Sequence, residues 1–314
     1  MPESIFRKLF DDLEQVDSFR VIVFTGGEAT LHPEMLKEGI RRGKALGLRT
    51  RIVSNAWWAK SVERSKAYLQ DLVDHGLDEI NTSYDDFHEP FIKIEKIGNL
   101  MEATMELGMT LGLGVINDRD AKYNTASIKQ YLCDRLGMPW SEMRKHLVLV
   151  DDYPTPSGTG ESLDVGGLSA GTKLDIGCPE IMKTISVHPN GSVKACCGHG
   201  QLYQKDLAIG NIAQESMKDI LERSTENIFY WWLHYVGPAN ILKRLGVNRD
   251  YASICHACND LLGPHREELV AYLRAHKDEI FQQEVLVSDH IVRMAEWIAG
   301  QEEVIVSKLA DEML

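Results

Sequence analysis

Hydrophobic residues in the first 150 positions gather into short apolar runs that are separated by amphipathic stretches. The apolar runs cover residues 20–25, 49–54, 79–83, 110–117 and 146–150. The amphipathic stretches include residues 33–46 and 61–75. This alternation predicts parallel strands joined by helices, with both faces of each strand covered, as in an α/β sheet or barrel. Because no clear strand opens the series, we expect an incomplete set.

The pattern changes after residue 150. Residues 151–173 are rich in Pro, Gly, Ser and Thr and predict a connection to a second unit. The segment "TISVHPNGSVKACC" then predicts a β-hairpin, and "FYWWLHYVGPANIL" predicts a packed helix with a break at Pro238. Residues 266–284 and 289–309 predict two amphipathic helices.

Composition and charge narrow the class of protein. The chain has 314 residues, is 44% hydrophobic and carries a formal net charge of −13. It is long enough for about two domains. The acidic balance argues against nucleic acid or an anionic membrane as a partner, and no apolar run approaches the ~20 residues that a membrane span requires. We therefore expect a cytoplasmic protein.

The ends of the predicted strands carry the polar residues that a ligand site needs. In parallel α/β folds ligands gather at the carboxyl ends of the strands. The candidate ligand-contacting residues at these ends are Gly26, Gly27, Glu28, Asn55, Ser83, Asp85 and Asn117. The glycines would let a ligand touch the backbone, and Glu28 would accept hydrogen bonds from an ammonium group. The alternative is that the glycines only form a turn and Asp85 only caps a helix, with His88 orienting Asp85.

Four of the six cysteines have the spacing of a metal centre. They are Cys178, Cys196, Cys255 and Cys258, with twelve residues between Cys178 and Gly191. Four thiolates suit an iron–sulfur cluster or a structural zinc ion. Strand parity favours Cys196 over Cys197 as the ligand and predicts that Cys197 is buried. A lone Cys133 fits a packed core position.

Together these segments resemble the radical S-adenosylmethionine (SAM) superfamily. The resemblance rests on "FTGGEATLHPEML", "RTRIVSNAWWA" and "INTSYDDFHE", and the cysteine spacing is similar to the auxiliary-cluster extension called SPASM, in its shortened, twitch-like form. It covers roughly residues 1–262 and implies a partial (β/α)6 TIM-like barrel without its first strand. The implied domains are residues 1–160 for the barrel, 161–177 for a linker, 178–262 for a hairpin and helical cluster domain, and 263–314 for terminal helices.

The resemblance also implies roles for the candidate residues. Gly26, Gly27 and Glu28 would hold the methionyl amino group of SAM, and Ser83 and Asp85 would face its ribose or carboxylate. Residues 154–160 would lie near the adenine. The cysteines Cys178, Cys196, Cys255 and Cys258 would bind an auxiliary [4Fe-4S] cluster.

One departure from the superfamily pattern is serious. The superfamily binds its SAM-cleaving cluster through a CxxxCxxC loop, and this chain has no cysteine before Cys133. We expect that the amino terminus is truncated, and a second [4Fe-4S] cluster is expected only with the missing segment. The alternative is a degenerate relative that binds iron–sulfur or zinc and acts through a partner.

For the complete protein, the resemblance implies an oxidoreductase-type enzyme. It would generate a 5′-deoxyadenosyl radical to modify a C–H bond of a peptide, or of a small molecule. Peptides made by ribosomes are the first expectation. An electron donor such as flavodoxin or ferredoxin would be a partner.

Overall fold

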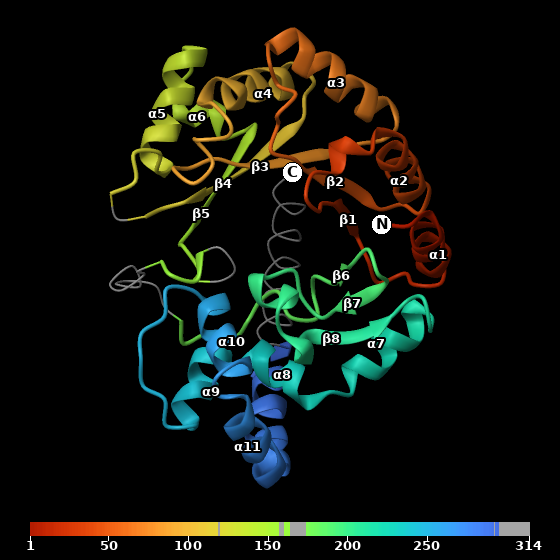
Figure 1. Cartoon of the computed structure of the whole chain (residues 1–314), viewed down its shortest axis with the longest axis vertical. Helices are drawn as coiled ribbons and strands as arrows, with labels where there is room; N and C mark the ends of the chain where they lie inside the picture. Colours follow the sequence, from red (N-terminus) through yellow and green to blue (C-terminus); the bar gives the residue numbers. More distant parts are fainter. Residues whose placement is uncertain (119, 157–159, 164–173, 292, 295–314) are drawn as a thin grey trace, which may run out of the picture. The chain divides into compact units, whose positions relative to one another are not determined.

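The computed structural model describes residues 1–118, 120–156, 160–163, 174–291 and 293–294. The chain divides into two compact units. One consists of residues Phe6–Pro154, and the other combines Met1–Ile5 with Thr155–Leu314. Each unit has its own sheet (Figure 1).

The first unit is built on a five-stranded sheet in the order β1-β2-β3-β4-β5, and every neighbouring pair is parallel. The strands are β1 Val21–Phe24, β2 Arg49–Val53, β3 Glu79–Ser83, β4 Thr110–Ile116 and β5 Leu147–Asp152. The helices of this region are α1 Glu3–Leu13, α2 Pro33–Ala45, α3 Val62–Asp74, α4 Ile94–Glu106, α5 Thr125–Leu136 and the short α6 Trp140–Met143. A 3₁₀ turn, η1 Ala29–Leu31, follows β1. The predicted α/β class and all five predicted strands are confirmed.

Local sequence explains where these helices begin. Ser61 accepts a hydrogen bond from the backbone N–H of Arg64 at the start of α3. Asn124 and Ser127 form a reciprocal capping box at the start of α5. Such caps satisfy backbone N–H groups that have no partner within the helix. Asn124 thus fixes the first turn of α5 just beyond the carboxyl end of β4.

The helices α2 to α5 all lie along one face of the sheet (Figure 1). Side chains on that face are buried among helix residues, as Ile52, Ile80 and Leu111 are, all with 0% exposure. Alternate residues point away and are half-buried or exposed, since strands direct successive side chains to opposite faces. The expectation that both faces are covered was therefore wrong: the strands alternate, and no helix described here covers the second face.

Two glycines explain how closely α2 packs on the sheet. A Cβ on Gly39 would lie 2.6 Å from the ring of Phe24, and one on Gly43 would lie 2.8 Å from a methyl group of Ile22. Because real Cβ atoms do not approach other atoms so closely, α2 sits nearer to β1 than any larger residue would allow.

The second unit carries a three-stranded antiparallel sheet of β6 Ser186–Val187, β7 Ser192–Lys194 and β8 Ala208–Asn211. The predicted hairpin is confirmed, whereas β8 was not foreseen. Two 3₁₀ turns, η3 His199–Leu202 and η4 Lys205–Leu207, connect β7 to β8. The sheet thereby places Cys196 and Cys197 just after its middle strand.

Helices make up the rest of the second unit. They are α7 Met217–Thr225, α8 Ile228–Tyr235, α9 Pro238–Arg244, α10 Ile254–Leu262, α11 Arg266–Glu279 and the π-helical turn η5 Ile280–Val285. The aromatic segment forms α8 as predicted, and Trp232 is fully buried against Tyr272. Most of the predicted helix 289–309 lies outside the described residues.

No helix in the described part of the chain has the length and apolar character to cross a membrane.

Candidate functional site

The two glycines after β1 expose bare backbone at the carboxyl end of the sheet. Gly26 and Gly27 are both exposed, and a Cβ on either would meet nothing within 4 Å. Gly26 has φ +142°, a conformation that side-chain-bearing residues rarely adopt. The space next to these peptide groups is therefore open to a ligand.

Glu28 links the end of β1 to the end of β2. Its Oε1 accepts hydrogen bonds from the Thr30 hydroxyl (2.6 Å) and backbone N–H (3.2 Å), and its Oε2 accepts one from the backbone N–H of Asn55 (2.8 Å). The Asn55 side chain in turn accepts from the N–H of Trp57 (3.0 Å). Both predicted residues thus meet at one place, where protein groups already hold Glu28 in position.

Asp85 is the most buried of the predicted ligand-contacting residues, with 0% exposure. Its Oδ1 accepts from the backbone N–H groups of Phe87 (2.9 Å) and His88 (3.2 Å) and lies 2.8 Å from His88 Nδ1. Its Oδ2 accepts from the N–H of Ile116 (3.1 Å), at the end of β4. Burial would raise the pKa of Asp85, but the hydrogen bonds from His88, Ile116 and Phe87 outweigh it and lower the pKa.

This burial corrects the expectation that Asp85 faces a ligand together with Ser83. Strand β3 ends at Ser83, so the alternation of side chains does not extend to Asp85. The buried carboxylate has no surface to offer a ligand. Asp85 instead ties the β3 end to the β4 end, which is the capping alternative.

Ser83 and Asn117 differ in how much of their hydrogen-bonding capacity is used. Asn117 is engaged: its Oδ1 accepts from the N–H of Thr125 (3.0 Å), and its Nδ2 donates to Asp151 Oδ1 (3.1 Å) on β5. Ser83 is half-buried, and its hydroxyl has no hydrogen-bond partner in the described residues. Of the two, Ser83 is therefore the side chain free to bind a ligand.

In the second unit, the four spaced cysteines gather in one neighbourhood. Burial raises the pKa of Cys178, and raises that of Cys196 to about 12. Negative charge at Cys178 and at Cys255 contributes to this raised pKa of Cys196. The pKa of Cys258 is raised well above its ordinary value by burial and then by Cys255, Cys178 and Cys196. The Cys196 and Cys258 sulfurs are therefore within electrostatic reach of each other and of the Cys178 and Cys255 sulfurs.

The surroundings of these thiols fit a metal–sulfur group. Backbone N–H groups of Glu180 and Ile181 donate to the Cys178 sulfur, and that of Gly198 donates to the Cys196 sulfur. Such donors favour thiolates and tune clusters. A Cβ on Gly198 would lie only 2.8 Å from the Cys255 sulfur, so this glycine leaves room for it. Among the residues with a described position, no group of three or more His, Cys, Asp or Glu side chains is arranged so that it could hold a metal ion.

Cys197 is exposed, so the prediction that it is buried was wrong. Strand β7 ends at Lys194, and the parity argument therefore does not reach Cys197. The Cys197 thiol donates to Glu180 Oε2 at 3.7 Å, whereas Cys196 is buried. Cys133 is packed against the core of the first unit, as predicted.

The end of α8 holds the first cysteine of the set. The Cys178 N–H donates to the carbonyl oxygen of Leu233 (2.9 Å), and the Cys178 carbonyl lies 3.2 Å from His234 Nδ1. A Cβ on Gly177 would overlap the carbonyl oxygen of His234, and one on Gly237 would overlap that of Ile176. Two chain segments therefore cross in direct backbone contact beside Cys178, an arrangement that sequence spacing did not reveal.

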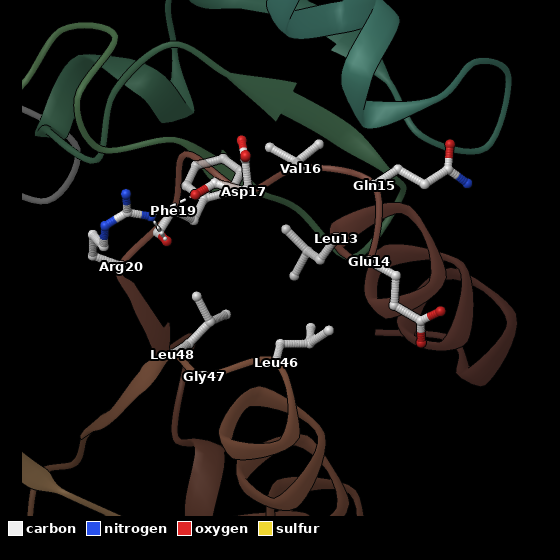
Figure 2. A pocket seen from close by; sticks show the side chains of 10 residues that line it. All are labelled: Leu13, Glu14, Gln15, Val16, Asp17, Phe19, Arg20, Leu46, Gly47 and Leu48. Carbon is white, nitrogen blue, oxygen red and sulfur yellow. Dashed lines mark hydrogen bonds between the residues drawn. The ribbon is translucent and has the colours of Figure 1, made fainter.

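A pocket of about 590 Å³ lies at the opposite end of the first unit's sheet from the glycines (Figure 2). It is formed where the chain enters β1 and β2, and apolar side chains such as Leu13, Val16 and Leu48 line it. Arg20 stands at its side and donates to backbone carbonyls of Asp17 and Phe19. Sequence reasoning did not identify this pocket.

Comparisons with known proteins bear on the cysteine region first. A family model described as the SPASM iron–sulfur cluster-binding domain matches residues 178–259, which include all four spaced cysteines. Over 308 residues the chain is 20% identical to a Bacillus subtilis (strain 168) protein called "Putative peptide biosynthesis protein YydG", covering 90% of this chain and 89% of that protein.

Two solved structures have weaker likenesses. BtrN in complex with AdoMet and 2-DOIA has a TM-score of 0.40 at 14% identity, over 74% of each chain. The Thermobaculum terrenum O-GlcNAc hydrolase mutant D120N has a TM-score of 0.31 at 12% identity, over 90% of this chain and 72% of that one. Neither value is high enough to define the fold.

The matched domain contains the cysteines that the sequence selected, and the glycine-glutamate motif stands at the carboxyl end of a parallel strand. Residues 178–259 therefore match the SPASM iron–sulfur cluster-binding domain, and the chain over most of its length is similar to a putative peptide biosynthesis protein.

Proposed function

We propose that this protein is a radical SAM enzyme that modifies a C–H bond in a peptide. The observation that carries the proposal is the shared neighbourhood within the matched domain of the buried Cys196 and the half-buried Cys178, Cys255 and Cys258. The peptide substrate is inferred from the peptide biosynthesis relative. When SAM and a reduced cluster are bound, the chemistry that they supply is removal of a hydrogen atom from an unreactive C–H bond.

The carboxyl end of the sheet would bind SAM. The open backbone at Gly26 and Gly27 admits the amino-acid part of the cofactor without steric conflict. Glu28, held by Thr30 and Asn55, presents carboxylate oxygens beside this space for the ammonium group. The Ser83 hydroxyl is available for a ribose or carboxylate oxygen.

Two further residues of this edge act by positioning others. Asp85 fixes the ends of β3 and β4, and Asn117 fixes the start of α5 against β5. Because fixed strand ends hold polar groups without further ordering on binding, less free energy is lost when SAM binds.

The cysteine set would hold an auxiliary [4Fe-4S] cluster through four thiolates. Backbone N–H groups at Glu180, Ile181 and Gly198 would stabilise the negative charge on the sulfurs. Four protein thiolates leave no iron for substrate, which favours electron transfer as the role of the auxiliary cluster. An external electron donor such as flavodoxin or ferredoxin would complete the system.

Anaerobic reconstitution tests the metal assignment directly. The purified chain is incubated with iron and sulfide, and iron, sulfide and zinc are then quantified per chain. We expect a brown protein with about four irons, as a cubane requires. One zinc ion per chain after anaerobic purification, with no iron uptake, would instead identify a zinc-binding protein and overturn the proposal.

A further inference from the structure

Trp57 is an exposed aromatic residue that the fold holds in one position just after β2. It is 41% exposed. Its backbone N–H donates to Asn55 Oδ1 (3.0 Å), its indole N–H donates to the Thr30 hydroxyl oxygen (3.1 Å), and its carbonyl oxygen accepts from Lys96 Nζ (2.9 Å). A tryptophan this exposed buries only part of its apolar surface, so packing alone does not explain the three contacts.

The residue before Trp57 has a strained backbone. Ala56 is fully buried and has φ +55°, in the left-handed region that residues with a side chain rarely adopt. Its N–H donates to Ser54 Oγ (3.1 Å), and its carbonyl oxygen accepts from the N–H of Ala59 (2.9 Å). Strained backbone of this kind gathers at ligand sites. Here it turns the chain directly before Trp57, whose indole reaches Thr30 beyond the end of β1.

The hydrogen bonds around Thr30 form a chain with a fixed direction. The indole N–H of a tryptophan can only donate, and a threonine hydroxyl has a single hydrogen. Because the Trp57 N–H donates to the Thr30 oxygen, the Thr30 hydrogen points away from Trp57 and donates to Glu28 Oε1, 2.6 Å away. Trp57 thus orients the Thr30 hydroxyl, and the hydroxyl in turn holds the Glu28 carboxylate.

A second group lies close to the Thr30 hydroxyl. The Tyr68 hydroxyl oxygen is buried and has no hydrogen-bond partner among the described residues. Thr30 is near enough to oppose the rise in the pKa of Tyr68 that burial causes. Since an unsatisfied buried oxygen is costly, loss of the Trp57 N–H would free the Thr30 hydroxyl to rotate and to donate to Tyr68 in place of Glu28.

We infer that Trp57 is a positioning residue for SAM, which acts through Thr30 to hold Glu28 where its carboxylate meets the ammonium group. This inference rests on the proposed function, because it takes Glu28 to bind that group. The N–H and hydroxyl of Thr30 and the N–H of Asn55 use about three of the four lone-pair positions of the carboxylate and leave about one for the ligand. A carboxylate that is fixed in advance loses little freedom when the ligand binds.

The test compares two ligands that differ in the ammonium group. SAM carries this group, whereas 5′-methylthioadenosine has the nucleoside without the amino-acid part. Equilibrium dialysis measures the affinity of the reconstituted chain for each. Trp57→Phe removes the indole N–H and keeps an aromatic ring, so it should weaken SAM binding about fivefold and leave 5′-methylthioadenosine binding unchanged.

Two substitutions of Thr30 separate the hydroxyl from the shape of the side chain. Thr30→Val has the same shape and no hydroxyl, and it should weaken SAM binding at least as much as Trp57→Phe. Thr30→Ser retains the hydroxyl and should keep SAM affinity close to that of the unaltered chain. Equal SAM affinities in Thr30→Val and Thr30→Ser would contradict the inference.

A matched control is Trp140→Phe, the same substitution at a half-buried tryptophan that begins α6 and packs against the core of the first unit. It should leave both affinities as they are in the unaltered chain. The inference is overturned if Trp57→Phe binds SAM as tightly as the unaltered chain. It is also overturned if Trp57→Phe weakens the binding of both ligands equally, as a purely structural role of Trp57 would.

Iron content and SAM binding of the unaltered chain separate this inference from the proposed function. About four irons and measurable SAM binding, with the same SAM affinity in Trp57→Phe, would refute only the role of Trp57. A chain that takes up no iron and binds no SAM would refute the radical SAM proposal and this inference with it.

Discussion

The side chains at the strand ends of the first unit and the cysteines of the second unit differ in how far other groups of the protein satisfy their hydrogen-bonding capacity. At the strand ends, Glu28, Asp85 and Asn117 already have protein donors. The residues Cys178 and Cys258 are instead half-buried and Cys196 is buried, and burial raises the pKa of all three thiols. The side chains at the strand ends are thus held in place by the protein itself, whereas the thiolates that burial opposes would be stabilised by the metal that we propose for them.

This contrast predicts the largest effects at the cysteines. Cys196→Ser should reduce iron from about four per chain to near zero and remove the stabilisation that the cluster supplies, several kcal/mol in apparent unfolding free energy. The matched variant Cys197→Ser should retain full iron, because Cys197 is exposed and points to Glu180. Iron analysis and thermal unfolding of the reconstituted proteins give the answer. Equal iron loss in both variants would break the comparison.

At the strand ends the largest effect should come from Asp85→Asn. The substitution removes the charge from a fully buried carboxylate that accepts hydrogen bonds from His88 and Ile116, and we expect a loss of about 2–3 kcal/mol. Asp86→Asn is the control: Asp86 accepts from the N–H groups of Lys122 and Tyr123 but is less buried, so it should cost about 1 kcal/mol or less. Urea unfolding at neutral pH measures both. A smaller loss for Asp85→Asn than for Asp86→Asn contradicts the assignment.

The pH dependence of stability sharpens the role of Asp85. Its pKa is lowered in the folded state, so its contribution is complete above the unfolded-state pKa of about 4 and is lost as pH falls through the lower folded-state value. The stability difference between the unaltered chain and Asp85→Asn should therefore be constant from pH 7 to pH 5 and shrink below pH 4. Urea titrations at pH 7, 5, 4 and 3 test this. A stability difference that grows in acid would mean that folding raises the pKa of Asp85 instead of lowering it.

The smallest effect on stability, with a clear effect on binding, is expected at Gly27. A Cβ there meets open space, so Gly27→Val should change the unfolding free energy by about 0.5 kcal/mol or less. It should nevertheless weaken SAM binding at least fivefold, because the side chain occupies the space proposed for the cofactor. Equilibrium dialysis with labelled SAM measures the affinity, and Gln15→Val is a control because Gln15 is exposed and lies at the other end of the sheet. An unchanged affinity for SAM in Gly27→Val would contradict the proposal that SAM binds at the carboxyl end of this sheet.

Much of the fold was predictable because the apolar runs are regular. Four of the five strands of the first sheet fall within their predicted ranges, and β5 extends two residues beyond its range. The sequence did not predict that one face of the first unit's sheet has no described helix over it. Val21, Val23, Val148 and Val150 look like buried strand residues in sequence, because an apolar side chain does not reveal whether a helix covers it. Strand β8 has only four residues and carries a glycine, and thus too little periodicity to be recognised.

The candidate site was predictable in its members more than in their orientations. The carboxyl ends of parallel strands necessarily share one edge, which placed Glu28, Asn55 and Ser83 correctly. Side-chain direction failed where strands end early, at Asp85 beyond β3 and at Cys197 beyond β7, because alternation holds only within a strand. The metal ligands and the SAM contacts stay predictions.

The backbone crossing at Gly177 and Gly237 has a consequence for how the protein matures. Cys178 acquires its position only after residues 178 and 234, far apart in the chain, have met, and closing this loop has an entropic cost. Assembly of the proposed iron–sulfur cluster on the four thiols would then follow this closure. The time course of iron uptake during refolding would thereby report when this part of the second unit folds.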